Sequence, residues 1–205
     1  MQNPKPSSAN AKKIISTTIK ELGINEKILS VKDIQNIISR AKDKLLTPEQ
    51  YRAEAGTDYK YRQIADIYEK YQKTLESSNV LDFDDIIFKT VELLQQNEDV
   101  RTYYQRKFRY VLVDEYQDTN HMQYLLTSLL AGGYENICVV GDDDQSIYRF
   151  RGATIENILN FEKQYRGSRT IRLEQNYRST QSILGAANAV IKNNVGRKGK
   201  SLWTK

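Results

Sequence analysis

Two acidic side chains follow a short apolar run near the middle of this 205-residue sequence. The run Val111-Leu112-Val113 is typical of a β-strand, and Asp114 and Glu115 come directly after it. In open α/β sheets, ligands bind at the carboxyl ends of the strands. An adjacent Asp and Glu can divide the work of nucleotide hydrolysis, since one can hold Mg²⁺ while the other accepts a proton from the attacking water. The simpler alternative is a pair of solvated acids at a strand end.

Three longer blocks of sequence contain or follow this pair. They are residues 114–120 (DEYQDTN), residues 141–153 (GDDDQSIYRFRGA) and residues 173–180 (LEQNYRST). In this order they resemble motifs II, III and IV of the UvrD/Rep/PcrA family of superfamily 1 DNA helicases. Residues 81–85 are similar to the stretch before motif II, and residues 197–204 are similar to the start of the family's second motor domain. The resemblance covers essentially the whole chain.

The resemblance implies the parts of an ATP-hydrolysis site. In that family the Asp of motif II, here Asp114, is associated with Mg²⁺, directly or through water. The Glu, here Glu115, is associated with activation of the attacking water. Gln145 matches the motif III glutamine that responds to the γ-phosphate, and a neutral amide suits this task because it can both donate and accept. The alternative for Gln145 is a residue that only stabilises the turn after three acids.

The third block adds two nucleotide contacts by the same resemblance. Tyr177 matches the residue that stacks on adenine, and Arg178 matches the arginine that reaches the γ-phosphate. A guanidinium there can neutralise the charge that grows as the phosphoryl group transfers. The resemblance therefore implies ATP and Mg²⁺ as cofactors. The catalytic residues that it implies are Asp114, Glu115, Gln145 and Arg178.

Part of the second block matches the segment that lies along single-stranded DNA in the family. Its side chains are Tyr148, Phe150 and Arg151. Stacking of a base on an aromatic face contributes about 1–3 kcal/mol and is nearly independent of sequence, as a moving motor requires. Many relatives carry tryptophan at the position of Phe150, so the platform here is smaller, and a buried core role for Phe150 is the alternative. The partners implied are single-stranded DNA and duplex junctions.

A phosphate-binding loop does not accompany these motifs. ATP hydrolysis in this class uses Gly-x-x-x-x-Gly-Lys-Ser/Thr after a strand, whose backbone N–H groups and lysine hold the phosphates. The only Gly-Lys-Ser run is residues 199–201, where Asn194 replaces the first glycine, so we expect a basic surface segment. Motifs I, Ia, V and VI are absent too. We therefore expect a piece of an ATP-dependent 3′-to-5′ DNA helicase or translocase that is inactive in hydrolysis by itself.

The spacing of apolar residues indicates which helices and strands hold these side chains in position. Before Tyr110 the apolar residues recur at helical spacing, and after it short apolar runs alternate with helical segments, as in a parallel sheet. The expected strands are residues 110–113, 136–140 and 170–173. The fold class is α/β, with a partial RecA-like (P-loop NTPase-type) parallel sheet and flanking helices, preceded by an all-helical subdomain.

Capping residues mark the expected helices. Ser30 with Asp33, Thr47 before Pro48, and Asp82 each predict a helix start. Expected later helices are residues 58–77, 121–130, 155–165 and 179–192. Side chains expected to pack between helices include Tyr59, Tyr61, Tyr68 and Tyr71. With the resemblance, the domains are residues 1–80 as a 1B-like helical subdomain, 81–173 as the later part of motor domain 1A, and 174–205 as motif IV and the start of domain 2A.

Composition narrows the class of protein. The net charge of +5 and the pI of about 9.1 are compatible with nucleic-acid binding without establishing it. The single cysteine, Cys138, excludes an internal disulfide, and its apolar neighbours predict a buried strand residue. No apolar run approaches the roughly 20 residues of a membrane span, so we expect a cytoplasmic protein with no membrane partner. The oligomeric state is not indicated.

Two other functions remain open from the sequence. One is a non-catalytic module that binds DNA or a partner, which predicts salt-sensitive binding of single strands without nucleotide dependence. The other keeps the motor but places it in a helicase–nuclease of the RecB/AddA type. A nuclease motif elsewhere in the protein would identify that class.

Overall fold

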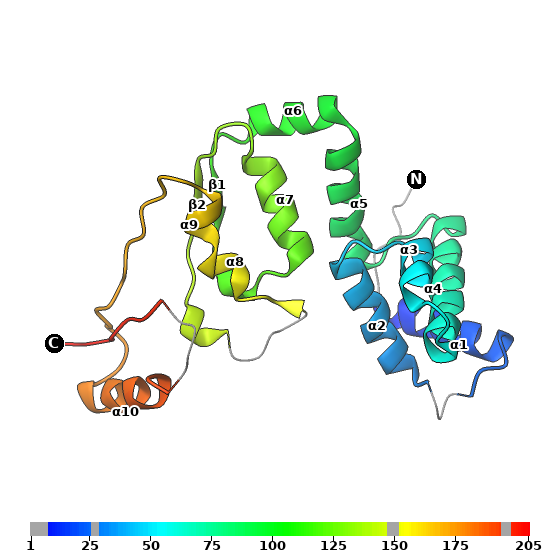
Figure 1. Cartoon of the computed structure of the whole chain (residues 1–205), viewed down its shortest axis with the longest axis horizontal. Helices are drawn as coiled ribbons and strands as arrows, with labels where there is room; N and C mark the ends of the chain where they lie inside the picture. The colour runs from blue at the N-terminus through cyan, green and yellow to red at the C-terminus, as the bar shows by residue number, and fades with distance from the viewer. Residues whose placement is uncertain (1–7, 26–28, 147–151, 194–197) are drawn as a thin grey trace. The chain divides into compact units, whose positions relative to one another are not determined.

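The computed structural model describes residues 8–25, 29–146, 152–193 and 198–205. The chain divides into two compact units (Figure 1). The first unit contains Met1–Arg109 and Asn120–Tyr134, and the second contains Tyr110–Thr119 and Glu135–Lys205. The chain therefore passes from the first unit to the second, returns for one helix, and ends in the second.

The first unit is built from seven helices among the described residues. They are α1 (Ser8–Glu21), α2 (Val31–Asp43), α3 (Pro48–Ala55), α4 (Tyr59–Ser77), α5 (Phe83–Gln96), α6 (Glu98–Lys107) and α7 (His121–Ala131). Three expected starts are confirmed, because Ser30, Thr47 and Asp82 each accept a hydrogen bond from a backbone N–H of the first turn. None of the helices in the described ranges has both the length and the hydropathy of a membrane span.

The core of the first unit lies among α1, α2 and α4. Its buried side chains include Ile15, Ile19, Ile34, Ile38, Ile64, Ile67, Tyr68 and Tyr71. The expectation that Tyr59 and Tyr61 also pack is wrong, since they are 76% and 49% exposed. The buried face of α4 begins only at Ile64, so Tyr59 and Tyr61 lie before the part of the helix that enters the core.

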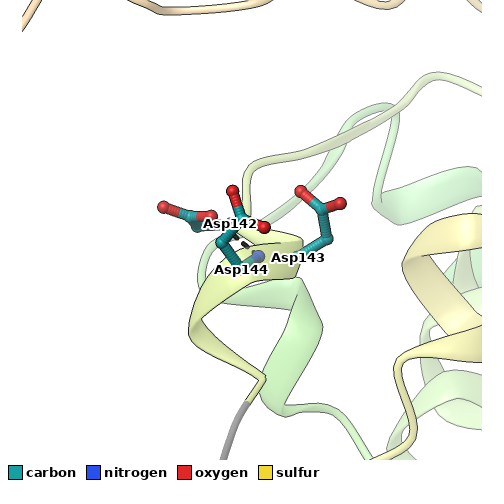
Figure 2. Close-up of side chains that lie close together, drawn as sticks. All are labelled: Asp142, Asp143 and Asp144. Atoms are coloured by element: carbon teal, nitrogen blue, oxygen red, sulfur yellow. Dashed lines mark hydrogen bonds between the residues drawn. The ribbon is translucent and has the colours of Figure 1, made fainter. Parts of the chain in front are cut away.

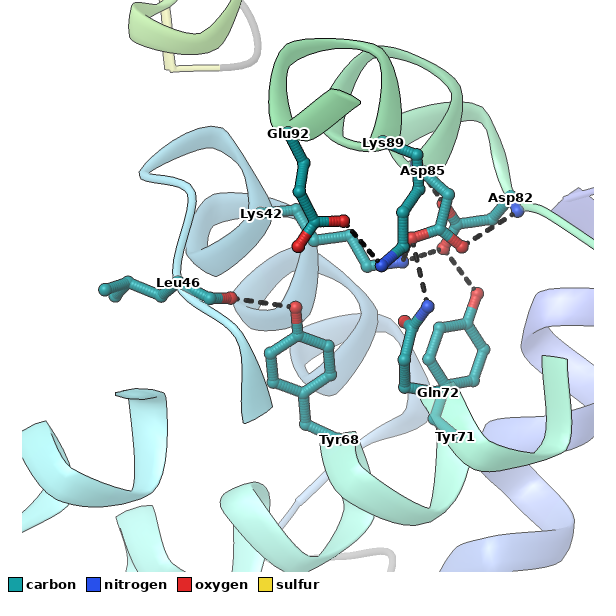
Figure 3. Close-up of polar contacts among 9 residues, drawn as sticks. All are labelled: Lys42, Leu46, Tyr68, Tyr71, Gln72, Asp82, Asp85, Lys89 and Glu92. Carbon is teal, nitrogen blue, oxygen red and sulfur yellow. Dashed lines mark hydrogen bonds and ion pairs between the residues drawn. The ribbon is translucent and has the colours of Figure 1, made fainter. Parts of the chain in front are cut away.

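A buried polar network joins α2, α4 and the start of α5 (Figure 3). The ammonium of Lys42, which is 1% exposed, donates to Asp82 Oδ2 and to Asp85 Oδ1 at 2.7 Å each. Tyr71 Oη donates to Asp82 at 2.8 Å, and Gln72 Nε2 donates to Asp85 at 3.2 Å. These partners compensate the desolvation that burial of three charged groups would otherwise cost.

The pKa values of the two carboxyl groups in this network are shifted in opposite directions. Burial would raise the pKa of Asp82, but the adjacent Lys42 ammonium outweighs burial and lowers that pKa below its usual range. Asp85 is only 1% exposed, and burial raises its pKa. Asp82 is also the N-cap of α5, where it accepts from Asp85 N–H. The carboxylate that pairs with Lys42 is therefore also the one that caps this helix.

The second unit is organised around a small parallel sheet. Its strands are β1 (Val111–Val113) and β2 (Ile137–Val139), paired in the register Val111 with Ile137 and Val113 with Val139. The helical elements are η1 (Tyr116–Asp118), η2 (Asp143–Gln145), α8 (Glu156–Leu159), α9 (Phe161–Gln164) and α10 (Gln181–Ile191). The architecture is thus a helix-rich α/β mixture with two parallel strands among the described residues.

The third expected strand, residues 170–173, does not form. Ile171 and Leu173 are 69% and 77% exposed, and no strand in the described ranges pairs with this segment. The chain instead makes an isolated parallel bridge between Gln175 and Trp203. An extended segment becomes a strand only where a neighbouring segment accepts and donates its backbone hydrogen bonds. Here the segment at Trp203 pairs with Gln175 and not with residues 170–173.

Cys138 lies in β2 as expected but is exposed, so the prediction of burial is wrong. Side chains alternate between the two faces of a strand. Val111, Val113, Ile137 and Val139 point to one face and are half-buried. Leu112, which is 77% exposed, shares the opposite face with Cys138. That face has no cover from the described residues, which the local apolar pattern could not reveal.

Candidate functional site

Asp114 and Glu115 occupy a sharp turn at the carboxyl end of β1. Glu115 adopts the left-handed conformation, with φ 49° and ψ 42°, and its N–H donates to Asp114 Oδ1 at 2.9 Å. A non-glycine residue in this region costs about 1–3 kcal/mol and is held there by its surroundings. Both side chains are exposed, and the chain turns at once into η1. The turn therefore presents two carboxylates beyond the end of the strand.

Because β1 and β2 are parallel, the residues that follow each strand lie at the same edge of the sheet. Val140 N–H donates to Val113 O at 2.8 Å, and Tyr116 N–H donates to Val140 O at 2.9 Å. These bonds continue the parallel pairing past the ends of β1 and β2. As a result, the acidic pair after β1 lies beside the residues 141–145 that follow β2.

Gln117 connects the two segments. Its side chain is buried, and its Nε2 donates to Glu115 Oε2 at 2.7 Å. Its Oε1 accepts from the backbone N–H of Asp142 at 2.9 Å. Gln145 Nε2 in turn donates to Asp142 Oδ2 at 2.9 Å. A continuous set of contacts thus runs from Glu115 through Gln117 and Asp142 to Gln145.

Asp142 is the centre of the segment after β2. Its carboxylate caps η2 by accepting from Asp144 N–H, and it forms an ion pair with Lys200. Burial would raise the pKa of Asp142, but hydrogen bonds from Lys200 and Gln145 outweigh it and lower that pKa below its usual range. The Gly-Lys-Ser run at residues 199–201 thus places its lysine on a carboxylate and is not followed by a helix among the described residues.

Asp142, Asp143 and Asp144 bring three carboxylates within 4.8 Å of one another at the start of η2 (Figure 2). Groups of the chain itself already occupy two of these carboxylates, because Lys200 forms an ion pair with Asp142 and Lys198 N–H donates to Asp143 at 2.7 Å. Asp114 is a better fit to a magnesium ligand. Its exposed carboxylate offers the hard oxygen that Mg²⁺ prefers, and that ion commonly uses one or two carboxylates together with water and phosphate oxygens.

Tyr177 and Arg178 lie on a separate turn before α10. Asn176 Oδ1 accepts from the N–H groups of Arg178 and Ser179, at 2.9 and 2.8 Å. Asn176 N–H also donates to Trp203 O at 2.7 Å, which anchors the turn to the end of the chain. Tyr177 is 87% exposed, so its ring is free to stack on a flat partner.

The structure therefore brings together some of the expected site residues and not others. Glu115 and Gln145 are linked through Gln117 and Asp142, and Asp114 adjoins Glu115. No hydrogen bond or ion pair in the described part of the chain joins Tyr177 or Arg178 to these residues. The three expected DNA-contacting residues, Tyr148, Phe150 and Arg151, lie outside the described residues.

Sequence reasoning missed Gln117, Asp142 and Lys200. The contact of Gln117 with Glu115 could have been predicted from the sequence, since an amide two residues after an exposed carboxylate can reach it within one turn. The contact of Lys200 with Asp142 could not, because Asp142 is 58 positions away along the chain and only folding brings the two together.

Comparisons with known proteins give a consistent result. Residues 4–166 match the model of the UvrD/REP helicase N-terminal domain. The chain is 50% identical over 197 residues to the ATP-dependent DNA helicase PcrA of Bacillus subtilis (strain 168), covering 96% of the chain and 26% of that protein. It is 48% identical over 204 residues to the ATP-dependent DNA helicase UvrD1 of Mycobacterium bovis, covering 95% and 26%. The chain thus spans about a quarter of the length of these relatives.

Proposed function

Because this chain belongs to the UvrD/REP helicase family, we propose that it forms part of an ATP-dependent 3′-to-5′ DNA helicase. The parent helicase couples hydrolysis of Mg-ATP to movement along single-stranded DNA and acts at duplex junctions in the cytoplasm. In this proposal residues 1–80 are a helical 1B-like subdomain and residues 81–173 belong to a RecA-like motor domain 1A. Residues 174–205 begin domain 2A.

The chemistry is assigned to the turn after β1. Asp114 holds Mg²⁺, directly or through water, and the ion supplies charge neutralisation at the phosphates. Glu115 accepts the proton of the attacking water, and Gln145 responds to the γ-phosphate. The observation that most directly supports this assignment is the hydrogen-bonded path from Glu115 to Gln145, because a base and a sensor that act on one phosphate should belong to one connected site.

The remaining contacts are assigned to two other segments. Tyr177 stacks on adenine and Arg178 approaches the γ-phosphate, where its guanidinium neutralises developing charge. The exposure of the Tyr177 ring supports the first of these roles. Tyr148, Phe150 and Arg151 contact single-stranded DNA through stacking and charge.

The test is the substitution Glu115→Gln in the parent helicase. It keeps the shape of the side chain and its hydrogen-bonding reach but removes the base, so DNA-stimulated ATP hydrolysis should fall about 100- to 10,000-fold while nucleotide binding persists. Glu135→Gln is the matched control, since Glu135 is also an exposed glutamate with positive φ, at the opposite end of β2. It should leave hydrolysis unchanged.

The 205-residue chain alone should bind no ATP productively, because its sequence contains no glycine-rich phosphate loop. A steady-state phosphate-release assay on the purified chain measures this. Hydrolysis by the chain that Glu115→Gln abolishes would overturn the expectation, and full activity of the parent carrying Glu115→Gln would overturn the assignment of the base.

A further inference from the structure

Gln117 is a buried side chain that forms hydrogen bonds with both segments of the site. It is 1% exposed, and its two amide atoms face different partners, the carboxylate of Glu115 and the backbone of Asp142. We infer that Gln117 is a positioning residue, which orients Glu115 for proton transfer and ties it to the loop that carries Gln145. This inference rests on the proposed role of Glu115 as the base.

The orientation of the Gln117 amide is fixed by chemistry. The Asp142 N–H is a donor only, so the amide oxygen must face it. That leaves Nε2 toward Glu115, where its N–H matches a carboxylate acceptor. The reversed amide would set two donors against each other at Asp142 and two acceptors at Glu115. Gln117 therefore offers Glu115 a donor of fixed direction.

The backbone around the amide leaves it little room to move. A Cβ atom added to Gly141 would lie 2.6 Å from Gln117 Oε1 and 3.2 Å from Tyr116 N. The amide thus lies directly against the chain after β2, at a distance that only glycine allows. Burial of the side chain and this close approach limit the movement of the amide and keep the donor aimed at Glu115.

Glu115 needs this support because its own side chain is exposed. The left-handed backbone at Glu115 sets where the side chain starts, but an exposed glutamate still rotates about its χ angles. The hydrogen bond from Gln117 occupies Oε2 and holds the carboxylate in one place. Oε1 has no partner in the described part of the chain and is available to accept the proton of a water. A fixed base reacts faster because its orientation is set before the reaction begins.

The same amide couples the base to the loop after β2. Because Asp142 N–H holds Gln117 and the Asp142 carboxylate holds Gln145, a shift of residues 142–145 moves the donor that orients Glu115. The state sensed by Gln145 can thus change the position of the base through two hydrogen bonds.

The decisive substitution is Gln117→Glu in the parent helicase. It keeps the size of the side chain and an acceptor for Asp142 N–H, but it removes the donor to Glu115 and places a second carboxylate there. We expect kcat for DNA-stimulated ATP hydrolysis to fall about 10- to 100-fold, as for lost orientation of a reacting group, with KM for ATP unchanged. Gln123→Glu is the matched control, since Gln123 also bonds a backbone N–H, that of Asn120, in the cap of α7.

A second pair of measurements separates the possible outcomes. If Gln117 acts through Glu115, adding Gln117→Met to Glu115→Gln lowers kcat no further than Glu115→Gln alone. Circular dichroism of each variant establishes that it is folded, and Gln117→Met replaces Gln117→Glu if the latter unfolds. Loss of activity with Glu115→Gln but an unchanged kcat with a folded Gln117 variant overturns the inference alone. Full activity with Glu115→Gln overturns the proposed function and the inference together.

Discussion

At the residue scale, the site depends on how closely backbone segments can approach. Glu115 is held in a left-handed turn, and the amide of Gln117 lies against the backbone of Gly141. Strain of this kind persists where the surrounding structure determines it, and it is concentrated at positions that bind or react. The turn after β1 therefore depends on Gly141, two residues after the end of β2.

Gly141→Ala tests this dependence. The added Cβ would lie 2.6 Å from Gln117 Oε1 and 2.9 Å from Ile158 Cδ1, so neighbours must move. We expect the second unit to lose about 1–3 kcal/mol of unfolding free energy, as for other overpacked sites. Urea denaturation followed by fluorescence of Trp203, the only tryptophan, measures the loss.

Gly185→Ala is the control for that measurement. Gly185 lies inside α10, and nothing stands within 4 Å of the position that a Cβ would take. Alanine should therefore be neutral or stabilise the helix by about 0.5–1 kcal/mol. Equal effects of the two substitutions would contradict the close approach at Gly141.

At the element scale, the N-cap of α5 forms an ion pair with a lysine that is distant in the sequence. Asp82 caps the helix and Lys42 of α2 pairs with both Asp82 and Asp85 at its start. Tyr71 and Gln72 of α4 complete the network (Figure 3). The segment at residues 81–85 thus has a structural role that its sequence alone did not indicate, namely to join three helices through buried charge.

Lys42→Met should destabilise the first unit by about 3–5 kcal/mol, because it leaves the buried carboxylate of Asp85 and the partly buried carboxylate of Asp82 without their counter-ion. Chemical denaturation followed by far-UV circular dichroism measures the change. Lys73→Met is the control. Lys73 is 72% exposed and forms a surface ion pair with Glu69, so its loss should change stability by less than about 1 kcal/mol.

The effect of Lys42→Met should also depend on pH. In the wild type the pKa of Asp82 is lowered, so its contribution is present above the unfolded pKa of about 3.9 and is lost as the pH falls through the folded pKa. Without Lys42 the buried carboxylates are instead easier to accommodate once protonated. The difference between the two proteins should therefore narrow below about pH 4, and a difference independent of pH would contradict the ionic role of Lys42.

At the scale of the whole molecule, apolar burial is distributed unequally between the two units. Most of the buried apolar side chains belong to the helices of the first unit. In the second unit the buried apolar residues among those described are Tyr116, Ala153 and Leu184. Since apolar burial is the main source of stability, the second unit should be the less stable one.

We therefore expect the chain to unfold in two steps. Trp203 reports on the second unit, and the helical signal in far-UV circular dichroism reports mainly on the first. The fluorescence transition should occur at a lower urea concentration than the circular dichroism transition, because probes of a two-state protein coincide and those of independent units do not. Coincident transitions would show that the two units unfold together.

Much of this protein is determined by short-range patterns in its sequence. The helix starts at Ser30, Thr47 and Asp82 were predictable because a cap acts on N–H groups only two or three residues away. The parallel pairing of β1 with β2 followed from the alternation of apolar runs and helices. The motifs that place the chain in its family are likewise contiguous blocks of residues.

Tertiary structure decided what depends on partners that are distant in sequence. Only the fold brought Lys200 to Asp142 and Lys42 to Asp85, and only the fold left Cys138 exposed. It also left residues 170–173 without a strand partner among the described residues. It also brought the amide of Gln117 between Glu115 and Asp142. Burial and long-range pairing are properties of the surroundings, and a residue's own neighbours along the chain do not contain that information.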